Sequence, residues 1–92
     1  MLRITRLAED SLHVTMLLEG QVRSQWVYQL DSIVNACVVA QQQVALDFRG
    51  VSFVSPAGIE LLKRFRDDGV RFVNCPAIVM DLLEGDQSWH DV

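Results

Sequence analysis

The chain has 92 residues, half of them hydrophobic, and a formal net charge of −4. This length holds one domain, which can bury enough apolar surface to fold without metal or disulfides. Eight basic residues spread along an acidic chain argue against a nucleic-acid ligand, because such binding depends on clustered Lys and Arg. No apolar run has the length of a membrane helix and the N-terminus lacks a long apolar signal segment, so we expect a cytoplasmic protein without membrane insertion.

The N-terminal half predicts a strand pair followed by a helix. Alternating apolar residues indicate strands over residues 2–5 and 12–18, joined by a turn at Glu9-Asp10-Ser11, and Gly20 is expected to close the second strand. Ser24 is the predicted N-cap of a helix that runs to about Ala40. Its apolar stripe includes Trp26 and Cys37, which we expect to pack in the core.

The C-terminal half predicts a second crossover. Residues 44–48 form a short apolar strand, and residues 49–54 are expected to be a loop. The next helix has its N-cap at Ser55 and Pro56 in the first helical position, and it ends before Gly69. A strand over residues 70–73 and a helix from Pro76 to Gly85 complete the pattern, and the tail 86–92 shows no periodicity.

These elements predict an α/β domain with a four-stranded mixed sheet in the order 1-2-3-4. Because parallel crossovers are right-handed, helices 24–40 and 56–68 should lie on the same face of this sheet. Alternation assigns nine apolar side chains to the helix-covered face: Leu12, Val14, Met16, Leu18, Val44, Leu46, Phe48, Val70 and Phe72. The opposite face is mixed in polarity, which leaves it open to solvent or to self-association as a homodimer.

The segment from Val44 to Gly58, VALDFRGVSFVSPAG, resembles the signature of the STAS family, the sulfate-transporter and anti-sigma-antagonist domains. In that signature a Leu-Asp-Leu-Ser-Gly-Val strand leads to an Asp-Ser-Ser-Gly or Asp-Ser-Ala-Gly helix start. The order of the flanking elements agrees, so the resemblance covers residues 1–85 as one STAS-like domain, with 86–92 as a C-terminal tail. The chain is shorter than many members, which continue with another strand and a helix.

The resemblance also implies how the domain works and where it departs from the family. In anti-sigma factor antagonists, a kinase phosphorylates the serine after the signature Asp, and the phosphate blocks docking of this helix onto the kinase. Here Ser55 matches the Asp and Pro56 matches the phosphoacceptor. Because proline has no hydroxyl group, the usual switch cannot operate at this position.

The predicted partner-binding residues lie on the signature helix and its start: Ser55, Pro56, Ala57, Gly58, Glu60, Lys63, Arg64 and Asp67. Ser52 and Ser55 are the candidates for an anion or phosphorylation site, since a helix N-terminus suits negative charge. Gly58 in the first helical turn indicates a close neighbour, which is either the protein's own strand or a partner. Asp47 is expected to be structural, because no second carboxylate, His or nucleophile completes a catalytic set with it.

The remaining polar residues do not indicate a metal or redox site. His13 and His90 lack metal-ligand spacing, and Cys37 and Cys75 lack a CxxC pattern, so we expect free thiols and neither metal nor cofactor. Cys75 precedes a helix N-terminus, where the dipole can lower the pKa of a thiol, although packing is the better interpretation. For Trp89 in the tail, the sequence does not distinguish a core residue from an interface residue.

The leading hypothesis is a non-enzymatic interaction module that docks a protein partner, such as an anti-sigma-like kinase, through the helix starting at Ser55. The alternative is an accessory STAS subunit of an ABC-type lipid transport system, bound to the transporter ATPase. Some stand-alone members of the family have this role and lack a phosphoserine switch. Nucleotide binding is a weaker hypothesis, because the sequence has no glycine-rich phosphate loop.

Overall fold

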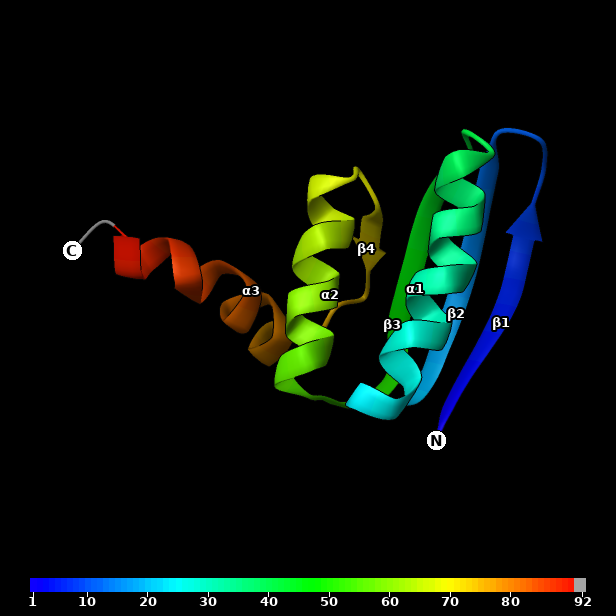
Figure 1. Ribbon diagram of the computed structural model, residues 1–92. Coiled ribbons are helices and arrows are strands. Elements are labelled where there is room, and N and C mark those ends of the chain that lie inside the picture. Colours follow the sequence, from blue (N-terminus) through cyan, green and yellow to red (C-terminus); the bar gives the residue numbers. More distant parts are fainter. Residues whose placement is uncertain (91–92) are drawn as a thin grey trace.

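Two crossover connections build the sheet, as the computed structural model shows (Figure 1). Residues 1–90 are described, with side chains up to Glu84. The elements in chain order are β1 (Leu2–Glu9), β2 (His13–Val22), α1 (Ser24–Val39), β3 (Gln43–Val54), α2 (Pro56–Asp67), β4 (Arg71–Val73) and α3 (Ala77–His90). The strand order is β1-β2-β3-β4, with β1 antiparallel to β2 and the other neighbours parallel. The predicted topology is confirmed.

Helices α1 and α2 pack on the same face of the sheet (Figure 1), as right-handed crossovers require. Alternate side chains of the two central strands are buried beneath them: Val14, Met16 and Leu18 of β2, and Val44, Leu46 and Phe48 of β3. Phe48 also meets Phe72 of β4 edge to face, with ring centroids 5.2 Å apart. The expectation that Leu12 faces the helices is wrong, because this residue lies in the β1–β2 turn with its side chain 62% exposed.

The central strands are longer than the sequence predicts. β2 does not end at Gly20, which takes a positive φ of 106° and lets the strand continue to Val22. β3 runs through the predicted loop as far as Val54. Its pairing with β2 shifts register twice, between Leu17/Glu19 and between Gly20/Gln21 of β2. These irregularities break the alternation of side chains, which is why residues 49–54 lack a strand pattern.

The predicted and observed helix boundaries agree best where a side chain caps the helix. Ser55 caps α2 as predicted, and Gly69 follows its C-terminus with a positive φ. Ser24 is not a cap but the first residue of α1, whose N-cap position is Arg23 and has no side-chain hydrogen bond. Cys37 is buried and Trp26 packs against the core, as expected.

Helix α3 leads away from the sheet after packing on α2 (Figure 1). Val79 and Leu83 are buried, and the guanidinium of Arg66 on α2 donates a hydrogen bond to the backbone oxygen of Leu83 at 3.1 Å. The helix does not stop at Gly85 but continues to His90, since one glycine costs a helix only about 1 kcal/mol. The predictions for the side chains of Trp89 and His90 lie outside the described residues.

Candidate functional site: the start of α2 and an apolar groove

The start of α2 is held rigidly by its N-cap. The side-chain oxygen of Ser55 accepts a hydrogen bond from the backbone N–H of Gly58 at 3.1 Å. The backbone N–H of Ser55 donates to the carbonyl oxygen of Val22 at 2.8 Å, which ties the cap to the end of β2. Ser55 is only 8% exposed. Its hydroxyl group therefore serves as the N-cap of α2 and is not exposed to a ligand.

Gly58 is buried against the protein's own strands. A Cβ atom at this position would lie 2.8 Å from the backbone oxygen of Val22 and 2.8 Å from a methyl group of Val54. Real Cβ atoms do not approach a backbone oxygen so closely, so only glycine lets α2 sit this near the ends of β2 and β3. Of the two alternatives for Gly58, internal packing is the one that the contacts support.

Two residues of the signature turn face outward. Pro56 and Ala57 are exposed, and Pro56 borders a shallow hollow of about 260 Å³ together with Val54, Ile59, Glu60, Lys63 and Leu82. We call this the α2 hollow. The ammonium group of Lys63 lies 3.5 Å from the carboxylate of Glu60. The α2 hollow thus brings together Pro56, Glu60 and Lys63 of the predicted partner-binding set.

A second hollow adjoins the first and was not predicted from the sequence. It is a groove of about 270 Å³ between residues 51–54 of β3 and Pro76, Ile78, Val79 and Leu82 of the α3 region. We call it the apolar groove. Ile78 is 70% exposed, Leu82 50% and Phe53 42%. Val54 and Leu82 line both hollows, so the two form one continuous surface.

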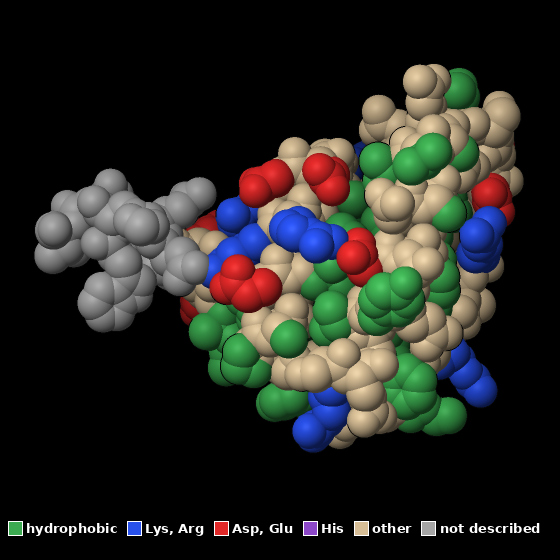
Figure 2. All heavy atoms as spheres, in the orientation of Figure 1, with side chains coloured by type: hydrophobic (Ala, Val, Ile, Leu, Met, Phe, Trp, Pro, Cys, Tyr) green, Lys and Arg blue, Asp and Glu red, His purple; other side chains and the backbone are tan. Residues whose placement is uncertain are grey.

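Figure 2 shows hydrophobic side chains gathered beside the start of α2, below a separate cluster of charged groups. From the sequence, α3 is expected only as a short helix with four apolar residues. A spacing of four residues between Ile78 and Leu82 places both on one side of a helix, whereas Val79 and Leu83 are buried. This second, outward apolar stripe is the signal that could have identified the groove.

Arg64 and Asp67 border a different hollow from Pro56. The guanidinium of Arg64 pairs with the carboxylate of Asp31 on α1 at 2.7 Å. Both predicted residues line a shallow hollow of about 330 Å³ between α1 and α2, with Asp31 and Asp68. This hollow is larger than the apolar groove, but its charged groups are typical of a solvated surface. The predicted residues of α2 therefore border two different hollows, one near the start of the helix and one nearer its end.

Ser52, the other candidate for phosphorylation, is exposed beside the groove. Its hydroxyl donates a hydrogen bond to the carbonyl oxygen of Gly20 at 3.1 Å, which links β3 to β2. Arg23 lies nearby, with its guanidinium carbon 4.6 Å from the centre of the Phe53 ring. This distance is typical of a cation–π contact.

Asp47 is buried where β4 ends. Its carboxylate accepts hydrogen bonds from the backbone N–H of Arg49 at 3.0 Å and from the side-chain amide of Asn74 at 3.2 Å. The Arg49 hydrogen bond is the main reason why the pKa of Asp47 is lowered, with a smaller contribution from Asn74. These contacts bind β3 to the loop after β4, which is a structural role.

The remaining polar candidates lie away from the two hollows at α2. Cys75 packs against the core, as expected, and burial raises the pKa of its thiol. His13 lies beside Asp10 in the β1–β2 turn, with Nδ1 3.5 Å from the carboxylate. Among the side chains that the structure describes, those of residues 1–84, no three His, Cys, Asp or Glu gather as potential metal ligands. No helix within residues 1–90 is long and apolar enough to span a membrane.

The structure resembles known STAS domains. SpoIIAA, an anti-sigma factor antagonist solved in its unphosphorylated form, superposes with a TM-score of 0.74 and 13% identity over 97% of this chain and 96% of its own. An antisigma-factor antagonist STAS domain from Rhodobacter sphaeroides gives 0.60 and 21% identity over 79% of this chain and 86% of its own. Mglu gives 0.59 and 22% identity over 78% of this chain, which matches only 19% of Mglu.

No family model and no curated protein matches the sequence. The likeness is carried by the arrangement of strands and helices. The chain has the fold of a STAS domain.

Proposed function

We propose that the chain is a non-catalytic interaction module that docks a protein partner through the start of α2 and the adjoining apolar groove. The observation that carries this proposal is the exposed apolar surface around Pro56, Leu82 and Ile78. Exposed apolar side chains that are contiguous and rimmed by polar groups are typical of interaction sites. The anti-sigma factor antagonists that share the fold support a protein as the partner.

We also propose that docking is not controlled by phosphorylation of the signature turn. Pro56 has no hydroxyl group, and the hydroxyl of Ser55 is buried in the N-cap of α2. A phosphate on Ser55 would have to fit into a cap that is buried against the end of β2. Ser52 is exposed in the lining of the apolar groove, where its hydroxyl donates to the carbonyl oxygen of Gly20, and the proposal is that it stays unmodified. The partner surface is then permanently available.

The second candidate function is that of an accessory subunit of a transport system. A partner surface that is permanently available favours it. A stable subunit interface is more hydrophobic than a transient one, and this surface exposes Phe53, Ile78 and Leu82 at 42% or more. A partner that binds only transiently under regulation requires less exposed apolar surface than a permanent subunit does. The two functions differ in the partner that they predict, a kinase or a transporter ATPase.

Capture of the partner from the native host tests the proposal. The tagged chain, a Leu82→Asp variant and a Tyr28→Asp control are purified from host cells, and bound proteins are identified by mass spectrometry. Tyr28 is 81% exposed on α1, away from the groove. We expect a partner with the wild type and the control, and at least about a tenfold loss with Leu82→Asp, as for an interface anchor. Equal capture by all three would contradict the proposal.

The intact mass of the same wild-type preparation tests the regulatory part. We expect the unmodified mass. A stoichiometric phosphate mapped to Ser52 or Ser55 would show that a switch exists, and it would favour the signalling function over the transporter subunit.

A further inference from the structure

β3 has a free edge along its second half. β4 is joined to β3 only at Ala45, Leu46 and Asp47, whereas β2 accompanies β3 as far as Val54. From Phe48 to Val54, β3 is therefore paired on one side alone within the described part of the chain. A strand edge of this kind offers unpaired backbone N–H and C=O groups to another chain.

Asp47 marks the point where the pairing stops. By bonding Asn74, it holds the loop after β4 at the edge of β3, and the chain then turns away into Cys75 and Pro76. The free edge continues beyond this point for seven residues, Phe48–Val54. At about 3.3 Å per residue, such a segment accommodates an extended peptide about 20 Å long.

The apolar groove runs beside this edge. Its floor and walls come from residues 51–54 of β3 and from Ile78 and Leu82 of α3. An added strand would direct alternate side chains toward the groove, because side chains of a strand point to opposite faces in turn. Backbone pairing and apolar pockets for alternate residues are the two components of strand addition.

The charges around the groove favour an acidic occupant, although the chain itself has a net charge of −4. None of the residues that line the groove is acidic. Arg23, which follows the end of β2, stacks on Phe53. Arg49 lies on the free segment of β3, 3.5 Å from the carboxylate of Asp47, with 59% of its side chain exposed. Glu19 is registered with Gly50 from the β2 side of β3, opposite the free edge.

We infer that the partner inserts an extended segment, apolar at alternate positions and acidic in between, as an additional strand along Phe48–Val54. This inference rests on the proposed function and specifies how the partner binds. The segment would place its apolar side chains against Ile78 and Leu82 and its carboxylates near Arg23 and Arg49. The α2 hollow, which shares Val54 and Leu82 with the groove, would receive the body of the same partner.

Selection from a phage-displayed library of random 12-residue peptides tests this inference even before the partner is identified. The wild-type chain is the bait, with Ile78→Asp and Tyr28→Asp variants as counter-screens whose folding is checked by circular dichroism. We expect enriched peptides with alternating apolar residues and Asp or Glu between them, bound by wild type and Tyr28→Asp but not by Ile78→Asp. No enrichment, or peptides with helical spacing of apolar residues, would overturn the inference.

The backbone contribution is tested with the best selected peptide in synthetic form. Methylation of two alternate amide nitrogens on one edge removes their hydrogen bonds and leaves the side chains unchanged, and a second peptide is methylated on the other edge. We expect one of the two to bind about tenfold more weakly or worse and the other to bind nearly as well as the parent, as the loss of two hydrogen bonds predicts. Equal affinities of all three peptides would refute strand addition.

Failure of this inference is distinguishable from failure of the proposed function. If strand addition is wrong but docking is right, host capture still depends on Leu82 while no peptide binds the groove. If docking is wrong, Leu82→Asp captures the same proteins as the wild type.

Discussion

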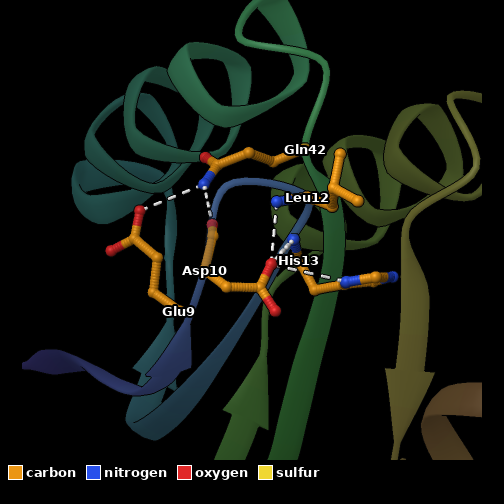
Figure 3. Close-up of polar contacts among 5 residues, drawn as sticks. All are labelled: Glu9, Asp10, Leu12, His13 and Gln42. Atoms are coloured by element: carbon orange, nitrogen blue, oxygen red, sulfur yellow. Dashed lines mark hydrogen bonds and ion pairs between the residues drawn. The ribbon is translucent and has the colours of Figure 1, made fainter.

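The two ends of the sheet differ in the groups that characterise their surfaces. At the hairpin end, formed by residues 9–13 and 41–43, polar groups bind one another (Figure 3). The side-chain amide of Gln42 donates to the carboxylate of Glu9 at 3.1 Å and to the backbone oxygen of Asp10 at 3.0 Å. The carboxylate of Asp10 in turn accepts the backbone N–H groups of Leu12 and His13, both at 2.7 Å. Polar contacts thus join the β1–β2 turn to the connection between α1 and β3.

The signature end, formed by residues 51–58 and 76–83, instead exposes apolar groups. Phe53, Ile78 and Leu82 contact solvent there. Trp26, in the first turn of α1, also lies toward this end, and its indole nitrogen is the one buried side-chain nitrogen or oxygen without a hydrogen-bond partner among the described residues. The polar groups of the hairpin end form hydrogen bonds with one another. The signature end instead has exposed apolar side chains and an indole nitrogen without a hydrogen-bond partner, which are features of a surface that contacts another molecule.

The largest expected effect comes from Gly58, where the signature end is closely packed rather than open. Gly58→Ala places a methyl group 2.8 Å from the backbone oxygen of Val22, and we expect a loss of about 1–3 kcal/mol in the free energy of unfolding, as for overpacking. Urea denaturation measures it. Ala57→Ser at the neighbouring exposed position is the control and should stay within about 0.5 kcal/mol. Equal stability of both variants would mean that α2 can move freely at its start.

The second effect concerns Asp47, which connects β3 to the loop leading into the groove. Because the folded pKa of Asp47 lies below its ordinary value of 3.8, its stabilising contribution is full above the unfolded pKa and is lost as the pH falls through the folded pKa. We expect Asp47→Asn to melt at a lower temperature than the wild type at pH 7, with the difference narrowing from about pH 5 to pH 3.

Thermal melts of both proteins across this pH range are the measurement. The pKa values of Glu9 and Asp10 are lowered too, mainly by hydrogen bonds from Gln42 and from the Leu12 backbone respectively. Both residues remain in the variant, so the difference between the two melting curves isolates Asp47. A difference that stays constant down to pH 3 would show that the ionised form of Asp47 is not what stabilises the fold.

The fold was largely predictable because local chemistry and global topology agree. Ser55 and Pro56 define the start of α2 through capping and proline geometry, which depend on neighbours in sequence alone. The alternation in residues 14–18 and 44–48 identifies the central strands. The handedness of crossovers then places both helices on one face. Each step uses short-range patterns or a general rule of topology.

The candidate site was predicted only in part, because it depends on distant segments. The groove exists because α3 packs Val79 and Leu83 inward and leaves Ile78 and Leu82 beside β3. The spacing of Ile78 and Leu82 indicates an outward apolar stripe on α3, but no local pattern indicates that this stripe lies beside β3. The sequence assigns Arg64 to the docking surface as an exposed residue of the signature helix, but it does not indicate that Arg64 pairs with Asp31 on α1. Spacing along one helix identifies neighbours on that helix but not the element that it faces.

The smallest expected effect is at the hairpin end, and it tests whether this end is purely structural. Gln42→Ala removes two exposed side-chain hydrogen bonds, so we expect a loss of about 0.5–1 kcal/mol and a decrease of a few degrees in Tm, about 4–8 °C per kcal/mol for a domain of this size. Gln43→Ala is the matched control, because the hydrogen bond from Gln43 to Leu12 is made by the backbone and survives the substitution.

Neither variant should alter partner capture, since both positions lie at the opposite end of β3 from the groove. Calorimetry measures the first expectation and host capture the second. Weaker capture by Gln42→Ala, with its Tm equal to that of Gln43→Ala, would show that the hairpin end belongs to the docking surface and would remove the contrast between the two ends.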